Sequence, residues 1–310
     1  MATDLWVEKY RPDNVKEYVF RDDAQRGQVQ NWIDDKGIPH LLFSGSPGTG
    51  KTTLAKVLIK ELDVQPADVL YINASRDNGV EMIRKRISAF SETMPWGDFK
   101  IILLDEADHI SPEGQAALRG VMEQYHASVR FILTCNYPNM IIPALHSRCQ
   151  GFHIEQLDQT DFTVRVGEIL ADNAVEFDLE TLDAMVRANY PDLRKTINTV
   201  QMTIVDNKLL LPDAGGSTAE WRVNMVELFR QGKIQDARKL IVKSARADEY
   251  NEIFTWLYKN LDLYTKDDFT YDSCVLAIRE GLIKHTQVAD PEINLSATMI
   301  EIARTLNGNT

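Results

Sequence analysis

The sequence is poor in cysteine, and the few cysteines it has are widely separated. Among 310 residues there are three, Cys135, Cys149 and Cys274, and no two of them form a CxxC pair. This spacing argues against a structural zinc site of the paired-cysteine type, and it favours a reducing compartment. We therefore expect three small, buried apolar side chains.

Long apolar runs and an excess of positive charge are also missing. No apolar run approaches the roughly 20 residues that a membrane-spanning helix needs. Residues 1–11 include four charged side chains and lack the apolar core of a signal peptide. We expect a soluble intracellular protein with no membrane partner. The formal net charge is −12, from 34 basic and 46 acidic residues, so no field of the whole molecule attracts nucleic acid. Contact with DNA would need a local basic surface, or a ring of subunits that concentrates such surfaces.

The first half of the sequence alternates short apolar runs with helical patterns. This alternation is typical of βαβ units on a parallel sheet, and therefore of an α/β fold. The expected strands cover residues 40–43, 69–73, 100–105, 130–135 and 151–154. The expected helices cover residues 51–62, 80–90 and 112–125. Ser111 and Pro112 supply an N-cap and a first-turn proline for the last helix.

The strand pattern stops after Ile154. Three amphipathic stretches, at residues 161–174, 179–188 and 193–204, predict a small helical lid. One proline and two glycines then interrupt the periodicity at residues 211–217. Further helical patterns follow at residues 221–230, 234–244, 250–263, 269–284 and 291–306. We therefore predict three domains: a sheet domain at 1–155, a helical lid at 156–210 and an all-helical domain at 216–310.

A phosphate-binding loop is expected between the first strand and the helix after it. Residues 45–52, Gly-Ser-Pro-Gly-Thr-Gly-Lys-Thr, fit the pattern G-x-x-x-x-G-K-[ST]. Glycines let backbone N–H groups wrap an anionic phosphate, and the helix N-terminus adds the positive end of its dipole. Lys51 can reach the β- and γ-phosphates, and the Thr52 hydroxyl can bind Mg²⁺. A simple glycine turn is the alternative, and the strand–loop–helix setting weighs against it.

Two consecutive acids, Asp105 and Glu106, follow the apolar run at 100–105. They lie at the edge of the sheet where open α/β folds bind ligands. Asp105 would hold Mg²⁺, directly or through water, and Glu106 could polarise an attacking water as general base. The alternative is a pair of loop acids that cap the next helix. Together with the phosphate loop, these acids predict an Mg-ATP site.

Three polar residues further along could complete an ATPase, although each has a plain alternative. Asn136 follows the next strand and could position the attacking water, or it could be a turn former. Arg148 could contact a phosphate of ATP bound by another subunit, or it could be a surface charge. Arg194 opens the third lid helix and could reach the nucleotide from the lid.

Several motifs occur in one order along the first two thirds of the chain. They are Trp-Val-Glu-Lys-Tyr-Arg-Pro at 6–12, the phosphate loop, Asp-Glu-Ala-Asp at 105–108, Ser-Arg-Cys at 147–149 and Asp-Leu-Arg-Lys at 192–195. In this order they resemble the sliding-clamp loader ATPases of the AAA+ class, which include replication factor C small subunits and the large loader subunit of T-even-like phages. The resemblance covers roughly residues 5–205. It implies an AAA+ domain with a helical lid and a C-terminal helical collar for oligomerisation. The compact length favours the phage branch, and thus the cytoplasm of a bacterial host.

The resemblance also implies roles at the nucleotide. The residues expected against adenine and ribose are Val7, Glu8, Lys9, Tyr10 and Val19. Those expected around the phosphates are Gly48, Thr49, Gly50, Lys51, Thr52 and Thr53. Asn136 would be sensor 1 and Arg194 sensor 2. Arg148 would be the arginine finger, directed at the ATP of the neighbouring subunit.

For coupling and DNA contact, the resemblance points to the second strand and two helices. Asn73 would be a polar switch that restrains Glu106 until DNA binds. Gln115 and Arg119 would couple DNA, ATP and the adjacent subunit. The candidates for DNA contact, made to phosphates rather than bases, are Arg76, Asn78, Arg84 and Arg119.

Two observations temper these assignments. A solvated helix face is the alternative for Arg84, and the family often has arginine where this chain has Asn78 and Gly120.

Phe90, Met94 and Trp96 form an apolar cluster suited to a clamp surface, although Phe90 could equally be buried core.

The reading that follows is an ATP-driven clamp loader. ATP binding would assemble subunits into a spiral that holds an open sliding clamp, and primer–template DNA would trigger hydrolysis and clamp closure. The expected partners are the clamp, that DNA and other loader subunits, at least one of them distinct. The alternatives are another AAA+ machine, such as a helicase loader or branch-migration motor, and a subunit that binds ATP only structurally. Intact Lys51, Glu106 and Arg148 argue against the last.

Overall fold

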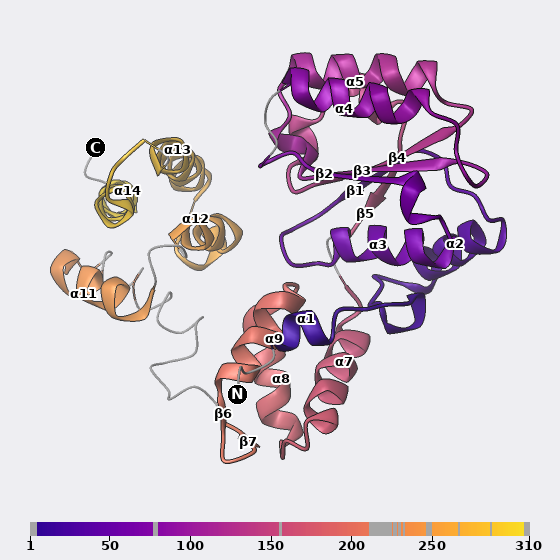
Figure 1. Cartoon of the computed structure of the whole chain (residues 1–310). Helices are drawn as coiled ribbons and strands as arrows, with labels where there is room; N and C mark the ends of the chain where they lie inside the picture. Colours follow the sequence, from indigo (N-terminus) through magenta and orange to yellow (C-terminus); the bar gives the residue numbers. More distant parts are fainter. Residues whose placement is uncertain are drawn as a thin grey trace. The chain divides into compact units, whose positions relative to one another are not determined.

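The computed structural model describes residues 5–76, 80–154 and 157–210, and in the C-terminal part residues 225, 228, 231, 233–245, 250–265, 267–285 and 287–306. The chain divides into two units, Met1–Leu211 and Pro212–Thr310 (Figure 1). Each unit has its own buried apolar core.

A five-stranded sheet forms the centre of the first unit. Its strands are β1 (Leu41–Ser44), β2 (Val69–Asn73), β3 (Lys100–Asp105), β4 (Val129–Cys135) and β5 (Gln150–His153). Their spatial order is β2-β3-β4-β1-β5, and every neighbouring pair is parallel. Each strand begins and ends close to the expected residues, and the expected α/β class is confirmed.

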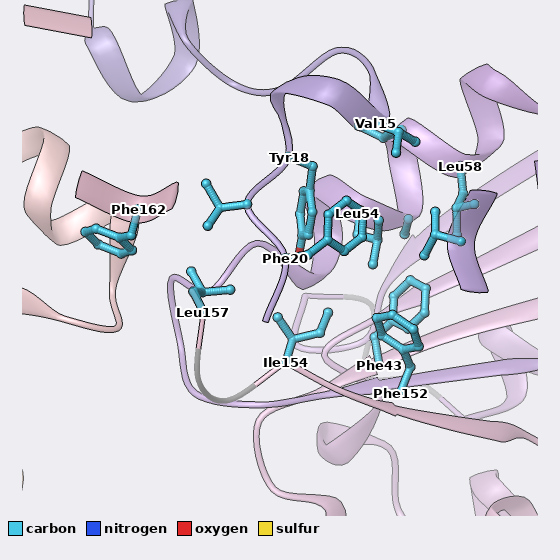
Figure 2. Packing of buried hydrophobic residues seen from close by; sticks show 14 of the residues in the cluster. Val15, Tyr18, Phe20, Phe43, Leu54, Leu58, Phe152, Ile154, Leu157 and Phe162 are labelled. Atoms are coloured by element: carbon cyan, nitrogen blue, oxygen red, sulfur yellow. The ribbon is translucent and has the colours of Figure 1, made fainter. Parts of the chain in front are cut away.

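Helices cover both faces of this sheet. Figure 1 shows α4 (Val80–Glu92) and α5 (Pro112–Gln124) over one face, and α2 (Asp23–Asp34) and α3 (Lys51–Glu61) over the other. Strand side chains alternate between the two layers. Phe43 packs in the core beneath α2 and α3, whereas Leu42 packs beneath α4 and α5. Figure 2 shows part of the first core, where the rings of Phe43 and Phe152 lie 5.5 Å apart.

Three helices after β5 belong to the same unit. They are α7 (Gln159–Asp172), α8 (Leu179–Asn189) and α9 (Leu193–Met202). Each begins after an aspartate whose carboxylate accepts a hydrogen bond from a backbone N–H of the first turn. Helix α9 stops at Met202, two residues before the expected end, because β6 (Ile204–Val205) pairs with β7 (Lys208–Leu209) in a hairpin.

Short elements that sequence patterns did not predict join the larger ones. They are α1 (Trp6–Lys9), η1 (Val15–Glu17), η2 (Pro66–Asp68), η3 (Ala107–His109), η4 (Pro138–Met140) and α6 (Pro143–His146). Helix α1 contacts α9, and the Trp6 backbone N–H donates to Oε1 of Gln201 at 3.1 Å. The N-terminal segment is thereby tied to the helical part of the unit.

Among the described residues of the second unit, every regular element is a helix. These elements are α11 (Ile234–Ser244), α12 (Tyr250–Lys259), η6 (Leu261–Leu263), α13 (Asp268–His285) and α14 (Pro291–Leu306). The helix expected at 221–230 lies mostly outside the described residues. In the part of the chain that the structure describes, no helix has the length and apolar character to cross a membrane. The three-domain division near residues 155 and 216 stays a prediction.

Candidate functional site

The loop between β1 and α3 depends on glycines at positions where the backbone is left-handed. Gly45, Gly48 and Gly50 have φ of 151°, 76° and 91°, a region that L side chains adopt only with strain. A Cβ at Gly45 would lie 2.2 Å from the backbone oxygen of Ile154, and a Cβ at Gly48 would lie 1.9 Å from Oδ1 of Asp192. The loop is therefore packed between the chain leaving β5 and the first turn of α9.

Lys51 begins α3, and its side chain folds back along this loop. Its Nζ donates to the backbone oxygens of Gly45 at 2.8 Å and Ser46 at 2.7 Å. Burial lowers the pKa of Lys51 to about 8, and Arg194 acts in the same direction. A buried cation beside the N-terminus of a helix stabilises an anion, so a phosphate oxygen fits here.

Asp105 is held at both carboxylate oxygens. Its Oδ1 accepts from the hydroxyls of Thr52 at 2.7 Å and Thr134 at 2.6 Å. Its Oδ2 accepts from the hydroxyl of Tyr71 at 2.9 Å. The structure therefore brings together the two residues predicted for Mg²⁺, Thr52 from the first turn of α3 and Asp105 from the end of β3.

The Thr52 and Asp105 oxygens fit a magnesium ion by their chemistry. Mg²⁺ prefers oxygen ligands, and it is usually bound through one or two protein groups together with substrate phosphates and water. Within the described residues, no group of three or more His, Cys, Asp or Glu side chains could hold a metal.

Glu106 follows Asp105 with a left-handed backbone, with φ of 58°. Its backbone N–H donates to the Thr134 hydroxyl at 3.0 Å, which fixes the turn. The polar side of the site is an open cavity. The cavity is lined by Pro47, Gly48, Gly50, Lys51, Thr52, Thr53, Asp105, Glu106, Thr134, Cys135, Asn136 and Arg194. The predicted base, water-positioning residue and lid arginine thus line the same space as Lys51.

Asp108 holds the segment that contains Asn136. Its Oδ2 accepts from the backbone N–H groups of Asn136 and Tyr137, each at 3.0 Å. This carboxylate, which the sequence analysis gave no role, fixes the end of β4 beside the cavity. The signal was available in the sequence, because Asp108 is the last acid of the Asp-Glu-Ala-Asp motif.

A second, more apolar pocket adjoins the loop. It is lined by Val7, Tyr10, Arg11, Pro12, Tyr18, Val19, Gly48, Thr49, Gly50, Thr53, Leu157, Arg165, Leu193, Arg194 and Ile197. Val7, Tyr10 and Val19, which were predicted to contact adenine and ribose, are among these residues. The shape and lining suit a base and a sugar next to the phosphates.

Glu8 and Lys9 lie outside this lining. Glu8 forms an exposed ion pair with Arg11 at 2.8 Å, and Lys9 donates to Oδ1 of Asn173 at 3.3 Å. Because α1 is helical, neighbouring residues point in different directions, so Val7 and Tyr10 face the cavity while these two face outward. Tyr18, Leu157 and Arg165 were missed, since they converge only through tertiary packing.

Arg148 lines neither cavity. Its guanidinium donates to the backbone oxygen of Ala144 at 2.9 Å and forms a close ion pair with Glu123. Arg119 reaches the same Glu123 oxygen at 3.2 Å. The two arginines, from α5 and from the end of α6, therefore share one exposed carboxylate away from the phosphate loop of their own chain.

Gln115 is buried and connects α5 to the segment before α6. Its Nε2 donates to the backbone oxygens of Ile110 at 2.9 Å and Met140 at 3.0 Å. Its Oε1 accepts from the backbone N–H of Ile142 at 2.8 Å. Gln115 thus joins the stretch after β3 to the stretch that leads to Arg148.

The residues predicted to sense DNA are only partly described. Oδ1 of Asn73 accepts from the backbone N–H groups of Ser75 at 3.0 Å and Arg76 at 3.2 Å. In the part of the chain that the structure describes, no hydrogen bond joins Asn73 to Glu106. Arg76 is exposed. Asn78 and the side chain of Arg84 lie outside the described residues.

The predicted apolar cluster at residues 90–96 separates into one packed and two exposed side chains. Phe90 packs against the core, with Lys100 Nζ 4.6 Å from its ring centre. Met94 and Trp96 are 85% and 84% exposed. The carboxylate of the fully buried Asp68 accepts from the backbone N–H groups of Trp96 and Gly97, both at 2.8 Å. This bond fixes the loop that presents the two side chains.

The chain is similar to a protein family and to several known sequences. A family model described as "ATPase family associated with various cellular activities (AAA)" matches residues 41–155. The replication factor C small subunit of Methanococcus vannielii is 34% identical, over 96% of this chain and 98% of the relative. That of Archaeoglobus fulgidus is 36% identical over 77% of each chain. That of Thermofilum pendens is 32% identical over 98% of this chain and 97% of the relative.

Two solved structures share the fold. A RuvB variant of Thermotoga maritima superposes with a TM-score of 0.58 at 14% identity, over 81% of this chain and 91% of its own. The RuvB Holliday junction branch migration motor of the same organism gives 0.55 at 12% identity, over 80% and 85%. At such low identity these structures support only the assignment of the fold.

Proposed function

Because the chain belongs to the replication factor C small-subunit family of AAA+ clamp-loader ATPases, we propose that it hydrolyses Mg-ATP at a site completed by a neighbouring subunit. The family supports an ATPase subunit of a clamp loader. The relatives named above are archaeal, and they lend no support to the expected phage branch. The residue roles, the metal, the DNA and the partner surfaces are the finer part of the proposal.

One observation carries this proposal. Lys51, Thr52, Asp105, Glu106, Asn136 and Arg194 line one cavity beside the glycine loop. Arg148 is held on another part of the surface by Glu123. A single chain therefore presents most of an ATPase site, and it presents a guanidinium where only another molecule can use it.

The mechanism follows from these positions. The loop N–H groups and Lys51 bind the β- and γ-phosphates, and Thr52 and Asp105 would hold Mg²⁺. Mg²⁺ would neutralise charge that develops on the phosphate oxygens. Glu106 accepts the proton of the attacking water, which Asn136 positions. Arg194 reaches the phosphates from α9 and couples the lid to the state of the nucleotide.

Arg148 supplies the missing positive charge to the neighbour's γ-phosphate. A planar guanidinium suits phosphate oxygens, and such an arginine acts only where subunits meet. To do so it must leave Glu123, an exchange of one anion for another in which its charge stays paired. Arg119, bound to the same carboxylate, lies close enough to join it at the subunit boundary.

Coupling to DNA is assigned to the end of β2 and to α5. Arg76 projects from the turn that Asn73 organises, so a phosphate contact there would act on Asn73 directly. Asn78, Arg84 and Arg119 are proposed as further phosphate contacts. Gln115 would pass a movement of α5 to the segment before Arg148.

Two exposed apolar surfaces suit the protein partners. Met94 and Trp96, on the loop fixed by Asp68, are proposed to contact the sliding clamp, because large exposed apolar side chains on a rigid loop make effective anchors. Phe269 and Leu276, seven residues apart on α13, are exposed on one helix face. We assign them to contacts between collar domains of adjacent subunits.

Replacing Arg148 tests the proposal most simply. In the assembled loader with clamp and primer–template DNA, Arg148→Ala should lower the ATPase rate about a thousandfold, because an arginine finger stabilises transition-state charge. ATP binding by the isolated chain should not change. Arg187→Ala, at an exposed arginine paired with Asp183 on α8, is the matched control. A normal rate for the assembled Arg148→Ala protein would refute the role in trans.

A further inference from the structure

Tyr71 makes a contact with the proposed metal site that none of the motifs indicates. It lies on β2, the edge strand of the sheet, next to β3 that ends in Asp105. Its hydroxyl donates to Oδ2 of Asp105 at 2.9 Å. The side chain is 44% exposed, so it is no part of the apolar core. The alternate residue Ile72 packs inside instead.

The surroundings hold the Tyr71 hydroxyl in this orientation. Asn73 lies two residues along the same strand, hence on the same side, and its Oδ1 accepts from the backbone N–H of Ser75 at 3.0 Å. On the other side, Nζ of Lys56 lies 5.5 Å from the centre of the Tyr71 ring. The contacts with Asp105 and Lys56 restrain both ends of the aromatic side chain.

Tyr71 completes the restraint on Asp105. The hydroxyls of Thr52 and Thr134 occupy Oδ1, and without Tyr71 the carboxylate could rotate about Cβ–Cγ around that one oxygen. With Tyr71 on Oδ2, both oxygens are fixed, and Asp105 lines the same cavity as Thr52 and Glu106. Partners of this kind commonly set the affinity of a metal-binding group.

We propose that Tyr71 is a positioning residue that orients the Asp105 carboxylate toward the nucleotide-bound divalent cation. The inference rests on the proposed function, since it takes Asp105 as the group that holds the metal. It adds a residue outside the motifs, two positions before Asn73, whose Oδ1 accepts from the backbone N–H of Arg76.

The test is the binding of Mn²⁺ to the full-length chain with a non-hydrolysable ATP analogue, measured by electron paramagnetic resonance. Tyr71→Phe keeps the ring and removes the hydroxyl. It should weaken Mn²⁺ binding about tenfold, while binding of the analogue in EDTA and the melting temperature stay as in the wild type. Tyr258→Phe, at an exposed tyrosine of α12, is the control and should bind Mn²⁺ normally.

Asp105→Asn distinguishes a failure of the role of Tyr71 from a failure of the metal assignment of Asp105. If Asp105→Asn loses Mn²⁺ and Tyr71→Phe binds it within about twofold of the wild type, the role of Tyr71 is refuted and the proposed function stands. If Asp105→Asn also binds Mn²⁺ normally, the metal assignment is refuted together with the role of Tyr71. A loss in Tyr71→Phe that is matched by a fall in melting temperature would mean a structural role, and would refute the inference as well.

Discussion

At the scale of single residues, the phosphate loop depends on places where no side chain fits. Gly45 combines a left-handed φ with a carbonyl oxygen 2.2 Å from where its Cβ would be. That oxygen belongs to Ile154, on backbone that cannot swing aside as a side chain can. Gly48 meets a carboxylate instead, which has more freedom to move. Gly45 is therefore the glycine of this loop that should tolerate substitution least.

Gly45→Ala should destabilise the protein by at least about 2 kcal/mol, since it adds backbone strain to a clash with backbone. Gly27→Ala is the control. Gly27 lies within α2 with nothing within 4 Å of the added Cβ, so alanine should stabilise there by about 0.5–1 kcal/mol. Urea unfolding of both variants measures the difference. Similar stability changes of the same sign in the two variants would contradict this account of the loop.

Residue identities in the motifs could be predicted, because each motif carries its chemistry at fixed local spacing. Lys51, Thr52, Asp105, Glu106 and Asn136 all line one cavity. Tyr71 and Arg165 could not be predicted, because they reach the site across the sheet or from α7. Their neighbours in sequence say nothing of such contacts. Glu8 and Lys9 show the reverse limit, since membership of a motif does not decide which side of a short helix faces the cavity.

At the scale of elements, the loop after α4 is rigid for a reason that lies elsewhere in the chain. Asp68 follows α3 by several residues, yet its buried carboxylate holds the backbone of Trp96 and Gly97. Lys100 Nζ donates to the backbone oxygen of Phe90 at 2.8 Å and so fastens the end of α4. Met94 and Trp96 are thus presented on a fixed support, which lowers the entropy lost when a partner binds.

The double variant Met94→Ala, Trp96→Ala should weaken clamp binding at least about tenfold, because both side chains would leave water on docking. Its melting temperature should match the wild type, since the two side chains are exposed. Met202→Ala, at an exposed methionine of α9, should bind the clamp normally. Titration of fluorescent clamp decides, and unchanged affinity in the double variant would rule out this surface.

Elements with strong periodicity were predicted close to their true bounds, as the five strands show. Helix α2 was missed because its sequence carries Gly27 and few apolar residues, and packing of Val29 and Trp32 against the sheet stabilises it instead. Ile204, the first residue of the β6–β7 hairpin, was predicted as the last residue of a helix. The hairpin's turn residues Asp206 and Asn207 have φ of 50° and 59°, and such a pair is a known hairpin signal that the apolar pattern obscured.

At the scale of the whole molecule, the residues proposed to bind ATP within one chain are separate from those proposed to contact other molecules. The cavity of one chain is lined by Glu106, proposed as the base, by Thr52 and Asp105, proposed to hold the metal, and by Lys51 and Arg194, proposed to bind phosphate. The residues proposed to contact other molecules lie on the surface: Arg148, Met94, Trp96, and Phe269 and Leu276 on α13. A chain of this kind is expected to turn over ATP slowly alone and to gain its rate on assembly, when a neighbour contributes Arg148.

Mixing two inactive variants tests this claim most directly. Lys51→Ala should be unable to hold its own phosphates, and Arg148→Ala should be unable to help its neighbour. Where the loader subunits assemble at random from equal amounts of both, about one quarter of head-to-tail interfaces would pair an intact Lys51 with an intact Arg148 across the boundary. The ATPase rate with clamp and DNA should therefore recover to about that fraction of the wild-type rate. If the mixture stays as inactive as either variant alone, while native mass spectrometry shows mixed assemblies, the ATP is not shared between subunits and the account is wrong.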